Sequence, residues 1–207
     1  MTILVLDARW PDMIPLAAAN LAGPLTYTDE VPVSVRWNLG DLIAADPTDQ
    51  PGPGALVTTD PNDPAIRTRI AAGERVIKAS SLSDPFLQAQ QVMHEARTRG
   101  EWEMEQTHET LIEYLEQETH ELIDAIRNHH PDEALKKELS DLLLQILFHA
   151  EIASRRGAFA FPDVAQAFID KMKNRAPYLF DGSTGIVAKH EQDRLWDEGK
   201  KRETGSA

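Results

Sequence analysis

Four carboxylates with matched spacing are the part of this sequence best suited to chemistry. They are Glu118 and Glu121, followed by Glu138 and Asp141. Residues three apart share one face of an α-helix, so each pair would present two carboxylates side by side. The turn-forming segment Asn128–Pro131 separates the pairs, and helices joined by so short a connection pack antiparallel. We therefore expect the two pairs to converge.

The surroundings expected for Glu118 point to a cation site. On the helical period, Leu111, Leu122 and Ala125 share its side of the helix, which places this glutamate in an apolar stripe. Carboxylates ~6 Å apart repel each other by about 3 kcal/mol per pair at an effective dielectric of ~20, so such a cluster holds a proton or recruits a cation. We expect no lysine or arginine of either helix to point into it. Oxygen ligands favour Mg²⁺, Mn²⁺ or Ca²⁺ over zinc. The alternative is a set of ordinary helical carboxylates, solvated or paired with bases from elsewhere.

Charge and composition narrow the classes of function. The 207 residues include 34 acidic and 21 basic side chains, a net charge of −13. Such a surface repels nucleic-acid phosphates, so we expect no nucleic-acid partner. The chain has no cysteine, which excludes thiolate zinc sites and thiol nucleophiles. The seven histidines form no ligand-like group, and we expect His149 to be a hydrogen-bonded core residue.

No feature of the sequence indicates a membrane or an export route. No apolar run approaches the ~20 residues that span a bilayer. The first residues, MTILVLDARWPD, lack both the basic region and the long apolar segment of a signal peptide. We expect a cytoplasmic protein without a membrane partner.

Proline usage divides the sequence into two parts, because ten of the thirteen prolines lie in the first 85 residues. Short apolar runs in this part are typical of strands. The expected strands are Ile3–Leu6, Val31–Val35, Ala55–Thr59 and Arg75–Ala79, with a helix over Pro64–Ala72 and a biased loop from Asp46 to Gly54. Residues 1–84 are therefore expected to form a small α/β N-terminal domain. Its role is open between a structural or interaction appendage and a second active site.

Residues 85–207 follow a helical period and are expected to form a mainly α domain. The expected helices are Pro85–Arg99, Gln106–Arg127, Asp132–Arg156, one from Pro162 to before Pro177, and a shorter one over Val187–Lys201. Long helices joined by short loops predict a four-helix bundle. Apolar residues surround the third helix, which indicates burial on more than one face. We therefore expect a homodimer packed through Leu142–Phe148, and leave open whether dimers pair into a tetramer.

Residues 102–200 resemble the MazG family of all-α nucleoside triphosphate pyrophosphohydrolases, in its actinobacterial form with an extra N-terminal α/β region. The segments that carry the resemblance are Trp102–His108 (WEMEQTH), Gln117–Glu121 (QETHE), Glu138–Asp141 (ELSD), Asp170–Phe180 (DKMKNRAPYLF) and Trp196–Lys200 (WDEGK). They follow one another in the family's order. The resemblance covers about half of the chain.

The resemblance implies an activity and a set of site residues. The activity is Mg²⁺-dependent hydrolysis of ribo- and deoxyribonucleoside triphosphates to a monophosphate and pyrophosphate, which clears unwanted nucleotides. The four carboxylates would hold Mg²⁺, for which Mn²⁺ can substitute. The residues assigned to the substrate are Lys171 and Arg175 for the phosphates, Trp196 and Lys200 for base and phosphates, and Trp102 for stacking on the base.

The sequence departs from the family pattern at three places. Gly100-Glu101 replaces Cys-Pro, Gln117 stands where the first glutamate of EExxE is usual, and Asn174 and Ala176 replace Arg and His around Arg175. The amide of Gln117 cannot act as a base, so help to an attacking water must come from a carboxylate. Two alternatives stay open: a related all-α hydrolase of another nucleotide, of the phosphoribosyl-ATP type, and a catalytically weakened regulatory or interaction protein.

Overall fold

The computed structural model describes residues 1–43 and 53–205. The chain divides into two compact units, Met1–Gln88 and Ala89–Ala207, each of which is described by itself. The division falls inside helix α3 (Pro85–Arg99). Most of the biased loop from Asp46 to Gly54 lies outside the described residues. Among the residues that are described, no helix is both long and apolar enough to cross a membrane.

The first unit is built on a parallel sheet with strand order β2-β3-β1-β4 in its described part. The strands are β1 (Thr2–Val5), β2 (Leu25–Tyr27), β3 (Ala55–Thr58) and β4 (Arg75–Lys78). Strand β1 pairs on both sides, with Thr2 opposite Ala55 and also opposite Arg75. All four residues of β1 are buried, as expected for a central strand of a parallel sheet that is covered on both faces.

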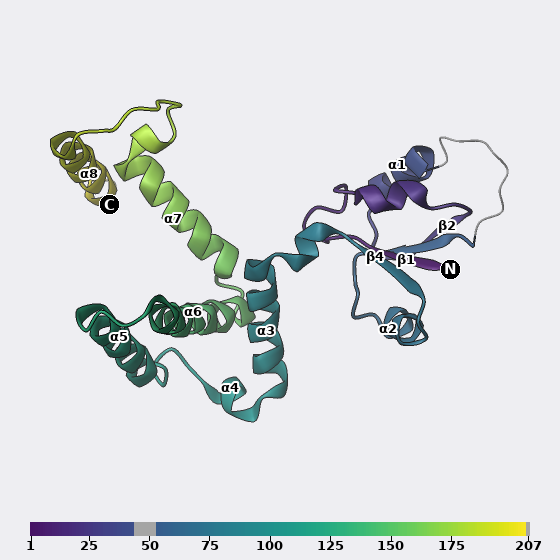
Figure 1. Cartoon of the computed structure of the whole chain (residues 1–207), viewed down its shortest axis with the longest axis horizontal. Coiled ribbons are helices and arrows are strands. Elements are labelled where there is room, and N and C mark those ends of the chain that lie inside the picture. The colour runs from purple at the N-terminus through teal and green to yellow at the C-terminus, as the bar shows by residue number, and fades with distance from the viewer. Residues whose placement is uncertain (44–52, 206–207) are drawn as a thin grey trace. The chain divides into compact units, whose positions relative to one another are not determined.

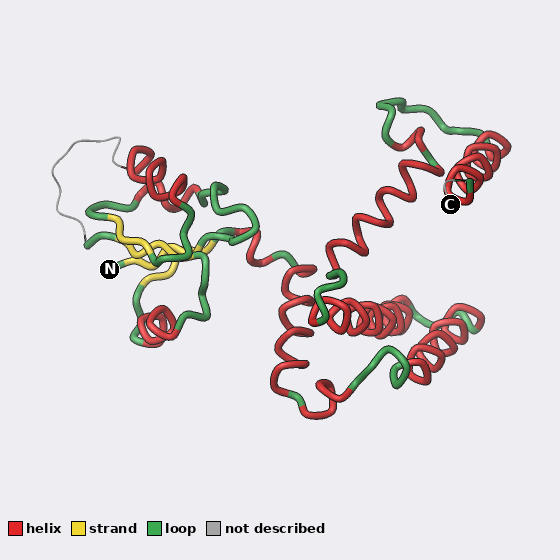
Figure 2. The backbone as a smooth tube through the Cα atoms, turned by 180° about the vertical axis from the view of Figure 1, so that it is seen from behind, coloured by secondary structure: helices red, strands yellow, loops and turns green. Residues whose placement is uncertain are grey.

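Helices cover the two faces of this sheet (Figures 1 and 2). They are α1 (Val33–Ile43), α2 (Pro64–Ala71) and the short 3₁₀ helices η1 (Leu16–Asn20) and η2 (Ser80–Ser83). Leu4 of β1 belongs to one core cluster with Val35 of α1. Its neighbour Ile3 packs on the opposite face with Ile66 of α2. Successive side chains of β1 therefore point to opposite faces of the sheet, so this one strand packs against the helices on both faces.

The expectation of a strand over Val31–Val35 is wrong, because α1 begins at Val33. The buried residues Val35 and Leu39 are four apart and face the sheet together. This helical period outweighs the β propensity of the valines, and Pro32 stands directly before the first helical residue, where proline is tolerated. The three-residue strand β2 is too short to give a sequence signal and was not expected.

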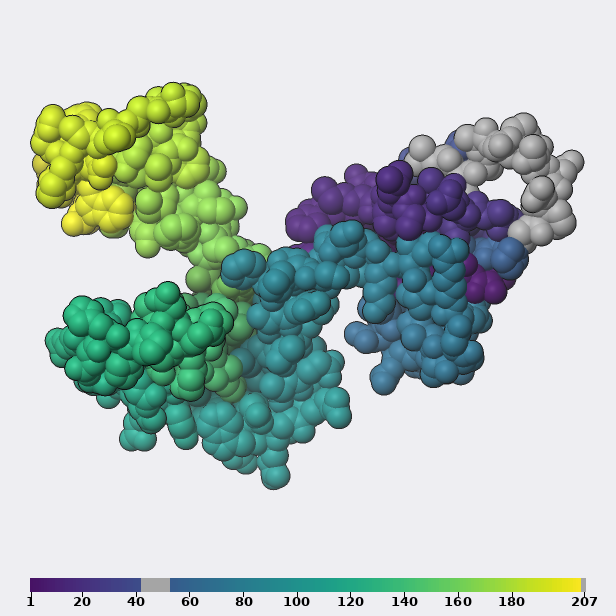
Figure 3. Space-filling view, in the orientation of Figure 1, coloured from purple at the N-terminus to yellow at the C-terminus, as the bar shows by residue number. Residues whose placement is uncertain are grey.

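The second unit is helical, which confirms the mainly α class preceded by a small α/β part. Its helices after α3 are α4 (Glu101–Glu105), α5 (Ile112–Arg127), α6 (Asp132–Arg155), α7 (Phe161–Arg175) and α8 (Lys189–Thr204), with a 3₁₀ turn η3 (Pro177–Leu179). Helix α5 packs along α6 (Figure 3), and α7 packs along α8 and also contacts α6.

Helix α5 starts later than the expected Gln106. Thr110 accepts a hydrogen bond from the backbone N–H of Thr107 at 2.9 Å and donates one to the Gln106 side chain at 2.8 Å. Threonine side chains that satisfy nearby polar groups in this way favour a turn over a helix. The helix proper begins at Ile112, one residue after the fully buried Leu111.

A compact apolar cluster anchors α5 and α6 at the end of α6 away from the carboxylates. Its buried members are Met93, Leu111, Leu147, Phe148 and Ile152. Leu147 and Phe148, expected at a dimer interface, are therefore buried in the core of their own chain. Met93 of α3 and Leu111 pack against Leu147 and Phe148, on the side of α6 for which the sequence suggested no partner within the chain. Leu144 and Ile146 of the same expected segment are exposed.

Candidate cation site

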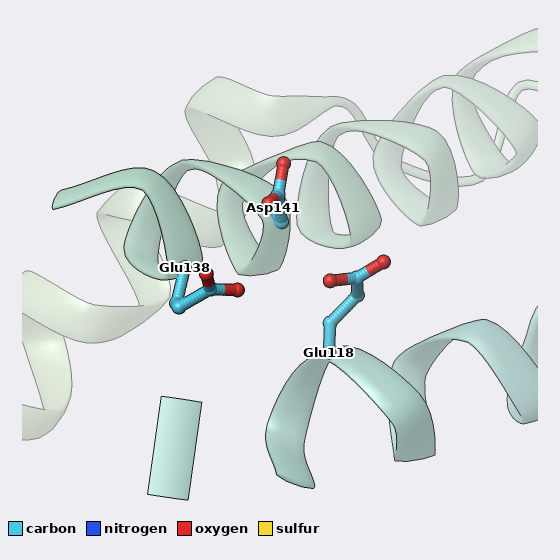
Figure 4. A group of neighbouring side chains, drawn as sticks. All are labelled: Glu118, Glu138 and Asp141. Carbon is cyan, nitrogen blue, oxygen red and sulfur yellow. The ribbon is translucent and has the colours of Figure 1, made fainter. Parts of the chain in front are cut away.

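Three carboxylates converge where α5 faces α6. Glu118 comes from α5, and Glu138 and Asp141 come from α6. One carboxylate oxygen of each lies within 4.8 Å of the corresponding oxygens of the other two, and Figure 4 shows the three groups pointing toward one another. All three residues are half-buried. The helical stripe that placed Glu118 among apolar residues is confirmed by the burial of Leu111 and Ala125 on the same side of α5.

A tight turn between α5 and α6 produces this convergence. The backbone N–H of His130 donates to the carbonyl of Ala125 at 3.0 Å, which closes the last turn of α5. His129 adopts the left-handed conformation, with φ of 52°, a region that histidine enters more readily than most residues other than glycine. The chain thus reverses in a few residues, and the i, i+3 pair of α6 comes to face Glu118.

The charges of the cluster are incompletely compensated. Burial raises the pKa of the Glu118 carboxyl, and the neighbouring carboxylates of Asp141, Glu121 and Glu138 raise it further. Glu138 has a buried oxygen, Oε2, without a hydrogen-bond partner among the described residues. A buried anionic oxygen without a donor is costly unless a cation neutralises it. The residues therefore fit a hard cation with oxygen ligands, such as Mg²⁺, Mn²⁺ or Ca²⁺.

The expectation that no lysine or arginine of these helices points into the cluster is wrong. Lys137 Nζ lies 3.0 Å from Asp141 Oδ2 and 3.2 Å from Glu138 Oε1. Lys137 is four residues before Asp141, so the two share a helix face at salt-bridge spacing. The long, flexible side chain lets the ammonium contact Glu138 as well as Asp141.

Glu121 lies outside the group of three. Its Oε1 accepts a hydrogen bond of 2.8 Å from Gln117 Nε2, one helical turn earlier, and the residue is exposed. Gln117, which replaces the usual glutamate, thus hydrogen-bonds Glu121, a carboxylate that the sequence placed in the cluster.

Of the basic and aromatic residues expected to bind substrate, Arg175 of α7 and Trp196 of α8 contact each other. The Arg175 guanidinium lies 5.1 Å from the centre of the Trp196 ring. The same guanidinium forms an ion pair with Glu203, and Arg175 and Asn174 together hold the pKa of the Glu203 carboxyl at about 2. Lys171 lies over the Phe168 ring at 5.5 Å, and Lys200 is exposed.

Asn174 and Gly199 make the close approach of α7 and α8 possible. Asn174 Nδ2 donates to the Gly199 carbonyl at 3.0 Å and to Glu203 Oε1 at 2.9 Å. A Cβ on Gly199 would lie 2.8 Å from Arg175 Cγ, closer than van der Waals contact allows. Glu203 was not among the residues expected at the site. Its place four residues after Gly199, on a helix that follows the arginine-bearing helix α7, is the one sequence feature that could have indicated it.

Trp102 belongs to the wall of the α5–α6 core. Its ring packs edge-on against Tyr114, with centroids 5.6 Å apart, and against Phe148 at 6.0 Å. The residue is still 46% exposed. Its structural role is therefore evident, and one side of the ring is open to solvent.

These features describe a largely helical protein with an acidic cluster between the helices α5 and α6. Residues 1–77 match the MazG N-terminal domain, and residues 106–180 match the MazG nucleotide pyrophosphohydrolase domain. The chain belongs to the MazG family.

Several known proteins are similar to this chain. The nucleoside triphosphate pyrophosphohydrolase of Mycobacterium tuberculosis is 40% identical over 98% of this chain and 62% of its own length. That of Mycolicibacterium smegmatis is also 40% identical, over 63% of its length. The chain thus spans somewhat over three fifths of these relatives. The crystal structure of a MazG-related protein from Thermotoga maritima aligns with a TM-score of 0.49 and 24% identity, over 55% of this chain and 97% of that one.

Proposed function

We propose that this protein hydrolyses nucleoside triphosphates and their deoxy forms to a nucleoside monophosphate and pyrophosphate, with a Mg²⁺ ion held by the acidic cluster. The convergence of Glu118, Glu138 and Asp141 around the unpartnered Glu138 oxygen is the observation that carries this proposal. The names of the mycobacterial relatives support it. Mn²⁺ is expected to substitute, because it takes similar oxygen ligands.

The chemistry is a displacement at the α-phosphorus. A water oxygen forms a bond to that phosphorus while the bond to the bridging oxygen breaks, and pyrophosphate leaves with the electron pair. The cation, when bound, would supply charge neutralisation on the phosphates. A carboxylate of the cluster would accept the proton of the water, because Gln117 carries no base. We propose Glu121, on the same helix as Glu118, as the fourth carboxylate of this machinery.

The substrate would extend from the cluster to the residues of α7 and α8. We propose that Lys171, Arg175 and Lys200 bind phosphate oxygens, and that Trp196 stacks on the base beside Arg175. Trp102 is proposed as a second stacking surface through its exposed side. Because Arg175 is paired with Glu203, phosphate binding at this guanidinium would require Glu203 to give up the pair.

We propose that the protein forms a homodimer, through a surface that includes the exposed part of the expected segment Leu142–Phe148 and extends beyond it. Helix α5 exposes a line of apolar residues at helical spacing: Ile112, Leu115, Ile123 and Ile126. Helices α6 and α7 add Ile146, Val164 and Phe168, which are also exposed in the single chain. Such apolar lines on several helices favour self-association. Light scattering that shows a stable monomer would contradict this proposal, and it would also separate a dimer from a tetramer.

A cytoplasmic role in clearing unwanted or damaged nucleotides would follow from this activity. The test is pyrophosphate release from a panel of nucleoside triphosphates, with and without Mg²⁺, beside a phosphoribosyl nucleotide. We expect Mg²⁺-dependent release from triphosphates and a large loss in Glu138→Gln. If the wild type and this variant are equally inactive while the wild type still binds nucleotide, the protein is a binding protein and the proposal fails.

A further inference from the structure

Lys137 occupies the place of a cation at the acidic cluster. Its ammonium contacts two of the three converging carboxylates, Asp141 at 3.0 Å and Glu138 at 3.2 Å. These are the only ion pairs to Glu118, Glu138 or Asp141 that the described part of the chain contains. The side chain is 64% exposed, so it reaches the carboxylates from the solvent side and is free to leave.

The ammonium only partly satisfies the carboxylates. It leaves Glu138 Oε2 buried and without a partner, and it makes no ion pair with Glu118. Among the described residues, Glu118 and Glu121 therefore form no ion pair, although the sequence placed both at the site.

A divalent cation and this ammonium compete for the same carboxylates. Mg²⁺ binds carboxylate oxygens at ~2.0–2.1 Å. Ligation by Glu138 and Asp141 would thus place two positive charges within a few ångströms of Lys137, where they repel the ammonium. Binding of the metal therefore favours release of the lysine.

We propose that Lys137 is an internal counter-cation, which neutralises the acidic cluster in the metal-free protein and is displaced when a divalent cation binds. The proposal rests on the cation site of the proposed function and adds a competition to it. Lys137 lowers the apparent affinity for the metal, and it reduces the repulsion among the carboxylates while no metal is bound. Metal binding then releases an ammonium beside the site.

Lys136 provides a matched control. It is the adjacent residue on α6, carries the same charge, and forms an exposed ion pair with Glu133 instead of the cluster. Lys136→Gln and Lys137→Gln therefore change the net charge of the protein equally. Lys136→Gln removes the ion pair with Glu133, whereas Lys137→Gln removes the ion pairs with Glu138 and Asp141.

The first measurement is the affinity for each metal alone. Calorimetry gives the affinity for Mg²⁺, and the electron paramagnetic resonance signal of the free ion gives the affinity for Mn²⁺. We expect Lys137→Gln to bind the metal about three- to tenfold more tightly than Lys136→Gln, because both competition and charge repulsion are removed. Equal or weaker binding by Lys137→Gln overturns the proposal. If Glu138→Gln binds the metal as well as the wild type, the cation site itself is wrong, which separates a failure of the proposed function from a failure of the competition.

A second measurement follows the lysine directly. The rate of acetylation of each lysine in the wild-type protein is measured by mass spectrometry with and without Mg²⁺. We expect saturating Mg²⁺ to increase the acetylation of Lys137 severalfold and to leave Lys136 unchanged, because a released amine is more reactive than one held in an ion pair. A Lys137 rate that falls or stays constant contradicts displacement.

Discussion

Gln117 Nε2 donates a hydrogen bond of 2.8 Å to Oε1 of Glu121, and this contact holds Glu121 apart from the three carboxylates that converge. The two residues are four apart on α5, the spacing at which side chains of a helix meet. A glutamate at position 117 would repel Glu121 instead of holding it. The main effect of Gln117 is therefore on the position of the Glu121 carboxylate. The loss of a basic group at position 117 is the smaller effect.

We predict that Glu121→Gln weakens Mg²⁺ binding much less than Glu138→Gln does. Glu138 lies in the converging group and has a buried, unpartnered oxygen, so its loss is expected to cost roughly tenfold or more in affinity. Glu121 is exposed and already hydrogen-bonded, and its loss is expected to cost roughly threefold or less. Calorimetric titration of both variants measures the difference. Equal losses would show that Glu121 joins the cluster when the metal binds.

The raised pKa of Glu118 predicts how the metal-free protein responds to pH. Burial and the neighbouring carboxylates place the folded-state pKa above the ordinary value of 4.5, so folding favours the protonated form. The contribution of this group to stability is therefore present at low pH and is lost as pH rises from 4.5 through the folded-state pKa. We expect Glu118→Gln to raise the melting temperature of the metal-free protein at pH 7 and to diminish the further rise on adding Mg²⁺. A lower melting temperature in the absence of metal would oppose this account.

A pair of histidines links the turn before α5 to α6. His149 is hydrogen-bonded, as expected, and is half-buried. The rings of His108 and His149 stack with centroids 5.1 Å apart, and their Nδ1 atoms are 2.8 Å apart. Arg156 Nη2 lies 2.9 Å from His108 Nε2. Because an arginine can only donate, His108 carries its proton on Nδ1 and donates to His149, which carries its own proton on Nε2.

This histidine pair predicts acid sensitivity. Burial, and then the neighbouring His108, lower the pKa of His149 below the ordinary value of 6.5. The groups that face the pair are Arg156 from the end of α6 and Glu109, which is next to His108 in sequence. The stabilisation is complete above pH 6.5 and is lost as pH falls through the lower, folded-state pKa. We expect His149→Gln to lose less stability between pH 7 and pH 5 than the wild type in denaturant titrations. The exposed His130→Gln should behave as the wild type, and a similar flattening in both variants would exclude the pair as the cause.

We predict opposite effects for two helical glycines. A Cβ on Gly199 would lie 2.9 Å from both Arg175 Cα and the Asn174 carbonyl oxygen. Gly199→Ala should therefore force α7 and α8 apart and cost about 1–3 kcal/mol. Nothing lies within 4 Å of a Cβ on Gly40 of α1, so Gly40→Ala should stabilise by up to about 1 kcal/mol through helix propensity. Thermal unfolding measures both, and a stabilised Gly199→Ala would show that the contact is not tight.

The convergence of Glu118, Glu138 and Asp141 could be predicted from the sequence because helical period and a short turn determine it almost completely. The mainly α class followed from the same periodicity. The late start of α5 could not be predicted, since it depends on hydrogen bonds of Thr110 that compete locally with the helix. The strand expected over Val31–Val35 failed because the burial of Val35 and Leu39 against the sheet decides the period there.

The contacts of long, flexible side chains were beyond the reach of sequence patterns. Lys137 lies four residues before Asp141 on α6, but the rotamer of its side chain decides whether the ammonium contacts Asp141 and Glu138. Glu203 pairs with Arg175 across two helices, and such a pair depends on how closely the helices approach. Backbone geometry is encoded by periodicity, whereas these pairs are encoded by tertiary packing.

The most direct test of the proposed reaction is the position of the new bond. Hydrolysis of a deoxynucleoside triphosphate in ¹⁸O-labelled water with Mg²⁺, followed by mass spectrometry of the products, locates the phosphorus that the water attacks. Attack at the α-phosphorus predicts one labelled oxygen in the nucleoside monophosphate and none in pyrophosphate. Label in pyrophosphate, or release of orthophosphate in place of pyrophosphate, would contradict the proposed function.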